Sequence, residues 1–358
     1  MTDLFSPLRL GPLTLPNRII MAPLTRGRAT RQAVPTPLMV EYYRQRAGAG
    51  LIITEATGIS RRGLGWPWAP GLWNQAQLEG WMPVTAAVHA AGGHIFAQLW
   101  HMGRLVHPSM GEVQPVSASE TTAPGDAHTY DAKQPNVLAR ALRVEEIPAL
   151  LDDYRRATRN ALAAGFDGVQ IHAANGYLID QFLRDGTNLR KDEYGGSIDN
   201  RLRLLREITT AVIEVAGRDR TAVRLSPNGE IQGVNDSQPH ETFPAAARAL
   251  AELGIVFLEL REPSPDSNFG KLDTSPVAPE IRAVFPGVLV LNSDFTGERA
   301  QSTIATGAAD AITFGRSFIA NPDLPLRLRE GLPVNQPDFA SFYTQGEKGY
   351  TDYPFALR

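Results

Sequence analysis

The sequence predicts a single-domain α/β protein built as a (β/α)8 TIM barrel, and three observations support this fold class. Eight short apolar runs recur along the 358 residues, each followed by a helical or potentially helical segment. Runs that are apolar throughout are typical of parallel strands covered on both faces. The fingerprint G-x-G-x-x-G of an open dinucleotide-binding sheet is missing, so the repeated strand and helix units favour a closed barrel.

The elements are expected in the following order. A β-hairpin over 8–20 opens the chain, because Leu8 and Leu10 precede a Gly11-Pro12 turn and further leucines follow it. Helices are expected over 39–46, 75–91 and 152–164. The barrel strands are expected at 19–24, 51–55, 94–101, the first half of 168–177, 222–226, 255–260, 288–292 and 311–316.

One connection is unusually long. The segment 102–143 follows the third expected strand and is rich in Pro, Ser, Thr and Gly. Insertions of this size in a compact domain are usually functional lids or disordered segments. Its place after a strand end puts it over the mouth of the barrel. No stretch resembles a linker, so we expect one domain over 1–358 with a lid insertion at about 102–143.

Composition excludes several classes of protein. The formal net charge of −3 gives no electrostatic case for a nucleic-acid or membrane partner. The chain has no cysteine, which excludes disulfides, thiolate metal sites and a cysteine nucleophile. The N-terminus lacks the basic and apolar regions of a signal peptide, and no apolar run approaches the roughly 20 residues of a membrane span. We therefore expect a cytoplasmic protein of enzyme size.

The most informative stretch is 168–177, where a buried strand runs into polar side chains. Val169 and Ile171 are β-branched and suit a strand. His172, Asn175 and Tyr177 follow at its carboxyl end, which in a barrel of this class faces the active-site mouth. A purely structural interpretation stands beside this one: His172 and Asn175 could satisfy local backbone groups while Tyr177 fills the core.

Two common barrel chemistries do not fit the residues at the strand ends. A Schiff-base aldolase needs a lysine in the mouth, and no lysine of this chain ends an expected strand. The lysines are Lys133, Lys191, Lys271 and Lys348. A metal hydrolase needs a cluster of ligands, but His101 and His172 arrive on different strands without an obvious third. The mouth is instead rich in neutral hydrogen-bonding groups, which suits a large, planar, polar cofactor.

Two arginines stand out among these groups. Arg224 lies inside an apolar run and needs a buried anionic or carbonyl partner. A structural salt bridge would satisfy it as well as a ligand would. Gly315-Arg316 follows the last expected strand, a region where barrels often bind phosphate, although a surface turn would produce the same pair.

Ordered motifs extend over essentially the whole chain. They are Met21-Ala22-Pro23-Leu24-Thr25-Arg26, Gln98-Leu99-Trp100-His101, His172-Ala-Ala-Asn175-Gly-Tyr177, Asp192-Glu193-Tyr194-Gly195-Gly196-Ser197 with Asn200-Arg201, Arg224-Leu-Ser-Pro, Phe314-Gly315-Arg316 and Gly349-Tyr350-Thr351-Asp352-Tyr353-Pro354. Together they resemble the Old Yellow Enzyme family of flavin-dependent ene-reductases. Within its classical branch they are similar to N-ethylmaleimide and 2-cyclohexenone reductases.

The resemblance implies non-covalently bound FMN across the barrel mouth, with NADPH or NADH as reductant. The residues implied for the isoalloxazine ring and ribityl chain are Pro23, Leu24, Thr25, Ala56, Gln98 and Arg224. Those implied for the phosphate end are Asn292, Ser293, Gly315 and Arg316. Thr25 would donate to the C4 carbonyl, and Arg224 would lie beside N1 and the C2 carbonyl, where charge gathers on reduction. The stretch 292–294 departs from the glycine-rich pattern of many relatives.

For the substrate, the resemblance implies an activated alkene conjugated to a carbonyl or nitro group. His172 and Asn175 would donate hydrogen bonds to its oxygen, hydride would come from flavin N5, and Tyr177 would protonate the α-carbon. The candidates for the apolar pocket wall are Trp66, Trp100, Phe269 and Tyr343. Each could equally be an ordinary packing aromatic.

Two other interpretations stay open from the sequence. One is an FMN barrel that oxidises a hydroxy acid or a dihydropyrimidine, which would require a base at the flavin. The other is a flavin carrier or sensor without turnover. We expect small-molecule partners, no nucleic acid or membrane, and a monomer or homodimer.

Overall fold

Eight parallel strands close into a barrel in this computed structural model, which describes residues 2–111, 114–263, 272 and 274–356. Each strand pairs with the next, and β15 pairs back to β3 through Ile312 and Ile19 to close the ring. The barrel strands are β3 (Ile19–Met21), β4 (Leu51–Ile53), β6 (Ile95–Trp100), β11 (Gly168–Ala173), β12 (Thr221–Leu225), β13 (Phe257–Arg261), β14 (Val288–Asn292) and β15 (Ala311–Phe314). The predicted fold class is confirmed.

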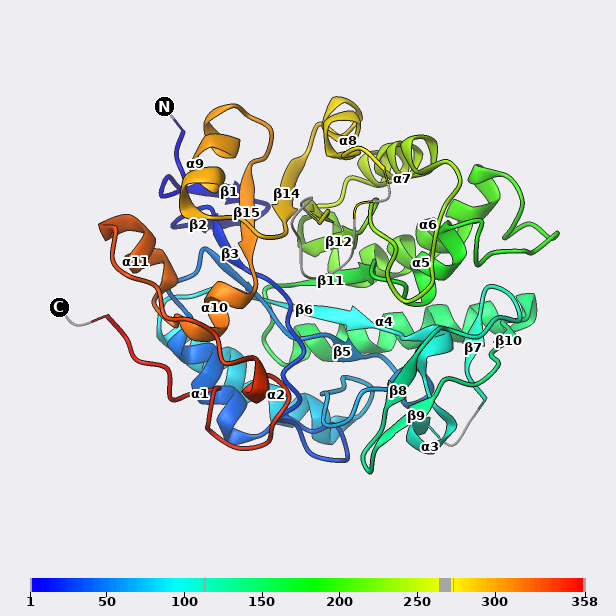
Figure 1. Cartoon of the computed structure of the whole chain (residues 1–358), viewed down its shortest axis with the longest axis horizontal. Coiled ribbons are helices and arrows are strands. Elements are labelled where there is room, and N and C mark those ends of the chain that lie inside the picture. Colours follow the sequence, from blue (N-terminus) through cyan, green and yellow to red (C-terminus); the bar gives the residue numbers. More distant parts are fainter. Residues whose placement is uncertain (1, 112–113, 264–271, 273, 357–358) are drawn as a thin grey trace.

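Helices surround this barrel (Figure 1). They are α1 (Pro37–Gln45), α2 (Gln75–Ala90), α4 (Ile147–Ala163), α5 (Leu178–Leu183), α6 (Ile198–Ala216), α7 (Pro239–Leu253), α8 (Ala278–Val284), α9 (Gly297–Ala305), α10 (Arg316–Ala320) and α11 (Leu324–Glu330). The strands β6, β11, β12 and β13 are buried along their whole length. Burial on both faces explains why these runs are apolar without alternation.

Local sequence signals set the helices. In α4 the residues Ile147, Leu150, Tyr154, Ala157 and Ala161 are buried, and their spacing of three or four places them on one face of the helix. Helix α2 begins with a capping box, in which the amide of its N-cap asparagine and a glutamine three residues later bind each other's backbone N–H. Such signals are local, so the sequence reveals them without any knowledge of the tertiary contacts.

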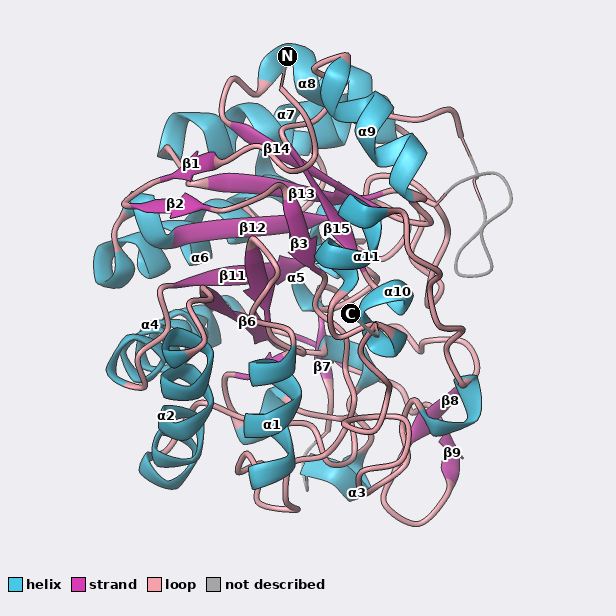
Figure 2. Cartoon of the chain, turned by 90° about the vertical axis from the view of Figure 1, so that its left-hand side faces the viewer, coloured by secondary structure: helices cyan, strands magenta, loops and turns pink. Residues whose placement is uncertain are grey.

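The N-terminal strands β1 (Leu8–Leu10) and β2 (Leu13–Leu15) pair antiparallel and lie against the amino ends of the barrel strands (Figure 2). The hairpin residues belong to the same apolar cluster as Ile20, Phe96 and Phe257. This hairpin therefore covers the end of the barrel opposite the strand ends that carry the polar residues.

The insertion 102–143 is folded in the described part. It contains the single-turn helix η2 (Gly103–Leu105), α3 (Pro108–Gly111), the parallel pair β7 (Val116–Ser117) and β10 (Arg140–Ala141), and the hairpin β8 (Asp126–His128) with β9 (Lys133–Pro135). Arg190 donates to the carbonyl oxygens of Ala118 and Leu142 and so ties the insertion to the barrel. In the part of the chain that the structure describes, no helix is long and apolar enough to cross a membrane.

Candidate active site

The strand register brings polar side chains from different strands to one level of the barrel. His172 of β11 lies opposite Arg224 of β12, and Arg224 lies opposite Glu259 of β13. Arg261 at the end of β13 lies opposite Asn292 of β14. Parallel strands place their carboxyl ends at the same end of a barrel, so these residues share the mouth or the layer directly beneath it.

A buried chain of hydrogen bonds crosses the barrel beneath the mouth. The amide of Gln98 donates to Gln170 Oε1 at 2.8 Å, and Gln170 Nε2 donates to Glu259 Oε2 at 2.7 Å. Thr313 Oγ1 donates to the other oxygen of Glu259 at 2.9 Å. Buried polar groups need partners of this kind, because an unpaired one costs about 1–3 kcal/mol. The chain therefore fixes the position of Gln98, one of the residues predicted to bind the cofactor.

Arg224 has the buried anionic partner that its position in an apolar strand predicts. Its Nε lies 3.3 Å from Glu259 Oε1, and its NH2 group donates to Asn292 Oδ1 at 2.7 Å. The Nε contact is close enough for an ion pair but lacks hydrogen-bond alignment. Asn292 in turn donates to the carbonyl oxygen of Thr313 at 2.9 Å. Both polar ends of the Asn292 side chain are thus used inside the barrel, where they hold Arg224.

His172, near the end of β11, and Tyr177, four residues after Ala173, pack together with Trp100 of β6. The ring of Tyr177 packs edge-on against His172, with 4.8 Å between the ring centroids, and edge-on against Trp100 at 4.9 Å. Asn175 has a left-handed backbone with φ of 58°. His172 and Asn175 are both at least nine-tenths buried.

Three polar atoms in this group have no hydrogen-bond partner among the described residues. They are Nδ1 of His172, Oδ1 of Asn175 and Nε1 of Trp100, all of them buried. More than about nine in ten buried polar groups in proteins are hydrogen bonded. Unpartnered atoms on neighbouring side chains are therefore what a ligand-binding site would leave for its ligand to complete.

Burial sets the protonation of the two titratable members of this group. It lowers the pKa of His172 well below its ordinary value, and the nearby positive charge of Arg224 lowers it further. The imidazole is therefore neutral at physiological pH. Burial also raises the pKa of the Tyr177 phenol to about 12, so the hydroxyl keeps its proton.

The aromatic candidates for the pocket wall form two groups. The ring of Trp100 lies nearly parallel to that of His172, with 6.4 Å between the centroids. Trp66 stacks on His128 at 4.3 Å and packs against Tyr343 at 5.2 Å. His128 belongs to β8 of the insertion, so this second group joins the insertion to the C-terminal segment. Phe269 lies outside the described residues.

The segment after β3 carries Pro23, Leu24 and Thr25, and Ala56 follows β4. Pro23 and Ala56 are buried, whereas Leu24 and Thr25 are partly exposed. A Cβ added at Gly315 would lie 3.4 Å from Leu24 Cδ2, which shows that the segments after β3 and β15 are in contact. These residues thus border the same mouth.

Positive charge gathers at the ends of β12 to β15. Burial lowers the pKa of Arg261 to about 10, and the charge of Arg224 lowers it further. Arg316 forms an ion pair with Asp294, which lies in the turn after β14. Ser293 and Asp294 have φ of 122° and 50°, values that favour glycine. The turn therefore keeps an unusual backbone without glycine at either position.

Sequence reasoning missed several residues of this site. None of Gln170, Glu259, Thr313 and Arg261 is singled out from the sequence. One signal was available: Glu259, like Arg224, stands inside an apolar run, and two opposite charges in neighbouring buried strands are expected to pair. Among the described residues there is no group of His, Asp and Glu that could hold a metal ion.

Comparison with known proteins decides which barrel family this is. The model of the NADH:flavin oxidoreductase / NADH oxidase family matches residues 3–335. The chain belongs to this family. The Old Yellow Enzyme homologue of Zymomonas mobilis superposes with a TM-score of 0.98 at 61% identity, covering 99% of both chains. Morphinone reductase in complex with tetrahydroNAD superposes with a TM-score of 0.94 at 44% identity, covering 100% of this chain and 98% of the other.

A sequence relative points the same way. A probable flavin mononucleotide-dependent alkene reductase of Leishmania infantum is 41% identical, covering 98% of this chain and 97% of its own length. The family membership confirms the Old Yellow Enzyme resemblance, and this NADH:flavin oxidoreductase is an FMN-dependent enzyme that takes electrons from NAD(P)H. The residues present fit FMN: the mouth holds neutral donors fixed by buried hydrogen bonds, an arginine with an unaligned N–H, and further arginines at the ends of β13 and β15 that suit a phosphate.

Proposed function

We propose that this enzyme reduces the C=C bond of an alkene conjugated to a carbonyl or nitro group, and that His172, Asn175 and Tyr177 perform the substrate chemistry. The observation that carries the proposal is the group of unpartnered buried atoms on His172, Asn175 and Trp100, beside the protonated Tyr177. Nε1 of Trp100 and the protonated ring nitrogen of His172 can donate, whereas Oδ1 of Asn175 can only accept, so the donor of Asn175 in this proposal is its Nδ2. Tyr177 holds one proton beside His172.

His172 and Asn175 bind the substrate oxygen. Hydride addition to the β-carbon moves negative charge onto that oxygen, so donors placed there stabilise the transition state more than the ground state. A neutral imidazole with a lowered pKa is suited to this role, because it donates one hydrogen bond without losing a proton to the product. The side-chain amide of Asn175 supplies the second donor.

Tyr177 gives its proton to the α-carbon. Its pKa, raised to about 12, keeps the phenol protonated at every pH at which the enzyme is expected to work. Edge contacts with His172 and Trp100 fix the ring. The oxygen-binding residue His172 and the proton donor are thus neighbours.

FMN, when bound, supplies the hydride that it has taken from NAD(P)H. We assign its ring and ribityl chain to Pro23, Leu24, Thr25, Ala56, Gln98 and Arg224, and its phosphate to Ser293, Gly315 and Arg316. Asn292 also holds Arg224, because its Oδ1 accepts from Arg224 and its Nδ2 donates to Thr313. Its second N–H is left for the phosphate end, to which we also assign it. Trp66, Trp100 and Tyr343 line the apolar wall, and NAD(P)H and substrate alternate in one mouth. The morphinone reductase complex with tetrahydroNAD supports this use of the mouth.

Enone-dependent oxidation of NADPH or NADH, measured without oxygen, tests this function. We expect 2-cyclohexenone, maleimides and nitroalkenes to be consumed with one equivalent of reduced nicotinamide, giving saturated products. Turnover of hydroxy acids or dihydropyrimidines instead would point to the alternative FMN barrels. Flavin reduction without turnover of any of these compounds would point to a carrier or sensor.

The proposal includes three further expectations from the sequence. The protein acts in the cytoplasm, as a monomer or homodimer, and residues 1–358 form one domain whose insertion at 102–143 covers the mouth. The contacts of Trp66 with His128 of the insertion support the last point.

A further inference from the structure

The backbone that carries Asn175 is held almost entirely by side chains. Asn175 and Gly176 both have left-handed backbone, with φ of 58° and 77°. Two consecutive residues in this region are unusual, and for asparagine the conformation costs on the order of 1 kcal/mol. A Cβ added at Gly176 would lie 3.0 Å from the carbonyl oxygen of Ile231, so the second position also needs glycine for lack of space.

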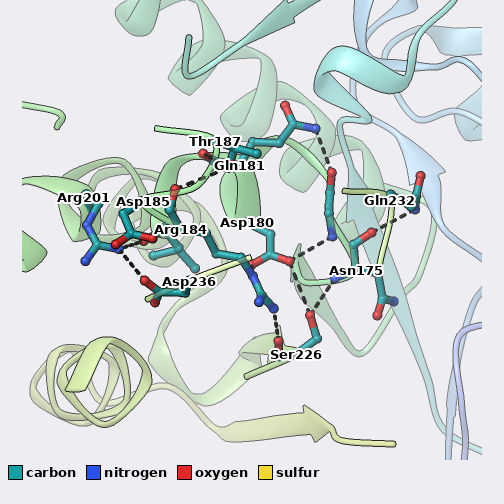
Figure 3. A network of polar contacts seen from close by, with 12 residues as sticks. Asn175, Asp180, Gln181, Arg184, Asp185, Thr187, Arg201, Ser226, Gln232 and Asp236 are labelled. Carbon is teal, nitrogen blue, oxygen red and sulfur yellow. Dashed lines mark hydrogen bonds and ion pairs between the residues drawn. The ribbon is translucent and has the colours of Figure 1, made fainter. Parts of the chain in front are cut away.

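All four backbone polar groups of these two residues are bound by side chains. The N–H of Asn175 donates to Ser226 Oγ at 2.8 Å, and its carbonyl oxygen accepts from Gln232 Nε2 at 2.8 Å. The N–H of Gly176 donates to Asp180 Oδ2 at 2.8 Å, and its carbonyl oxygen accepts from Gln181 Nε2 at 2.8 Å. The turn thus takes its conformation from these four side chains (Figure 3).

Asp180 is the centre of this arrangement. It is fully buried, and its Oδ1 accepts from Arg184 Nε at 2.8 Å in an ion pair that is likewise buried. Its Oδ2 accepts from the N–H of Gly176 and, at 3.4 Å, from the hydroxyl of Ser226. Arg184 also donates to the carbonyl oxygen of Ser226. From α5, Asp180 therefore binds the turn at Gly176 and, through Ser226, the segment that follows β12.

The carboxylate also sets the direction of the hydrogen bonds. A serine hydroxyl has one proton, and Ser226 gives it to Asp180, so the oxygen lone pairs are left for the N–H of Asn175. An uncharged amide at position 180 has one oxygen and one NH2 group, so the NH2 group would face either Arg184 or the N–H of Gly176. In either orientation one of these donors loses its acceptor.

We infer that Asp180 is a positioning residue: through Ser226 and Gly176 it holds the left-handed turn that aims the Asn175 amide at the substrate oxygen beside His172. The inference rests on the proposed function, since it assigns Asp180 and Ser226 a role only through Asn175. Neither side chain is expected to touch the substrate or the cofactor.

The test compares Asp180→Asn and Ser226→Ala with a matched control, Asp323→Asn. Asp323 and Arg327 form a second ion pair with the same spacing, 2.7 Å long and at most 8% exposed, on α11 away from α5. The measured quantity is the dissociation constant of p-hydroxybenzaldehyde for the oxidised holoenzyme, followed through its charge-transfer band, together with FMN content and melting temperature. We expect Asp180→Asn and Ser226→Ala to retain FMN and to bind the phenol about tenfold more weakly. Asp323→Asn should leave the dissociation constant unchanged.

A double-mutant cycle separates positioning from general loosening of the fold. If Ser226 acts through Asn175, then Ser226→Ala should weaken phenol binding in the unchanged protein but by less than about twofold in an Asn175→Ala background. Equal weakening in both backgrounds would overturn the inference. So would Asp180→Asn binding no more weakly than Asp323→Asn. If Asp180→Asn yields no holoenzyme, the double-mutant cycle with Ser226→Ala decides whether the inference holds, because Ser226→Ala keeps the Asp180–Arg184 ion pair.

Failure of the proposed function would look different. In that case His172→Ala and Asn175→Ala would themselves leave phenol binding intact, and no enone would be reduced. The inference about Asp180 fails alone if those two variants bind weakly while Asp180→Asn and Ser226→Ala bind normally.

Discussion

His172 lies directly opposite Arg224 in the paired strands β11 and β12, and the arginine charge adds to burial in lowering the pKa of the imidazole. The structure thus keeps His172 neutral through its position in the barrel. Because a histidine with its ordinary pKa near 6.5 would become charged on mild acidification, this pairing has a consequence for the pH dependence of substrate binding.

We expect enone turnover to show no ionisation of His172 near pH 6.5. The lowered pKa means that the ring gains a proton only at a pH well below that value. The measurement is the rate of flavin oxidation by 2-cyclohexenone from pH 5.5 to 8, in the unchanged protein and in His172→Gln. An inflection between pH 6 and 7 that disappears in the variant would contradict this expectation.

A second prediction concerns the stability of the fold in acid. Burial lowers the pKa of His101 to about 4, below its unfolded value near 6.5. The unfolded chain therefore binds the proton first, so stability is lost as pH falls from 6.5 towards 4. His101→Asn removes this loss while Asn Oδ1 can still accept from the N–H of Gly103, as His101 Nδ1 does at 3.1 Å.

The check is chemical denaturation of both proteins at pH 7.5 and pH 5. The unchanged protein should lose about 2 kcal/mol more of its free energy of unfolding than His101→Asn between these values. Buried Glu55, whose pKa is raised to about 7 mainly by burial, acts in the opposite direction but is common to both proteins. If both proteins lose the same free energy of unfolding between pH 7.5 and pH 5, His101 is not neutral in the folded state.

The role proposed for Thr25 predicts an effect on the reduction potential. Thr25→Ala removes a donor to the reduced ring, which carries more negative charge, so the midpoint potential of bound FMN should fall by roughly 10–30 mV. Reduction by NADPH should then slow, while oxidation by an enone should hold or increase. Thr25→Ser keeps the hydroxyl and serves as the control. If the unchanged protein, Thr25→Ala and Thr25→Ser have the same midpoint potential, Thr25 does not donate to the flavin ring.

Tyr177→Phe should slow the oxidation of the flavin by an enone but not its reduction by NADPH. Flavin reduction by NADPH needs no proton at the substrate carbon and should stay nearly intact. Oxidation by 2-cyclohexenone should slow by roughly 10²–10⁴ if protonation becomes limiting. A nitroalkene should be affected less, because its nitronate is stable enough to leave and take a proton from water. Stopped-flow measurements that show equal slowing of both half-reactions would assign Tyr177 to shaping the pocket.

The sequence is sufficient for the barrel because the signals for its elements are local. The apolar run 288–292 coincides with β14, and the helix expected over 75–91 ends one residue beyond α2. Boundaries were less accurate at β13, which begins at Phe257 rather than at 255. Ile255 and Val256 before it are apolar, and Val256 already donates to the carbonyl oxygen of Thr221. The register of paired residues begins only at Phe257, so hydrophobicity alone does not mark the start.

The polar contacts could not be predicted in the same way, because they depend on register between strands far apart in the chain. Gln98 and Gln170 are separated by 72 residues, and Arg224 and Asn292 by 68. A shift of one residue in any strand would turn these side chains away from one another. The sequence shows that Arg224 needs a partner and offers Glu259 as a candidate, but it does not give the strand register that places the two residues opposite each other.

Phenol binding by a double variant tests most directly the claim that His172 and Asn175 bind the substrate oxygen. The oxidised, FMN-containing protein should bind p-hydroxybenzaldehyde with a long-wavelength charge-transfer band. Replacing both residues with alanine should weaken binding by about 1.5–3 kcal/mol for each hydrogen bond to the phenolate, with a comparable loss in enone turnover. An unchanged dissociation constant in a double variant that retains its FMN would contradict the account.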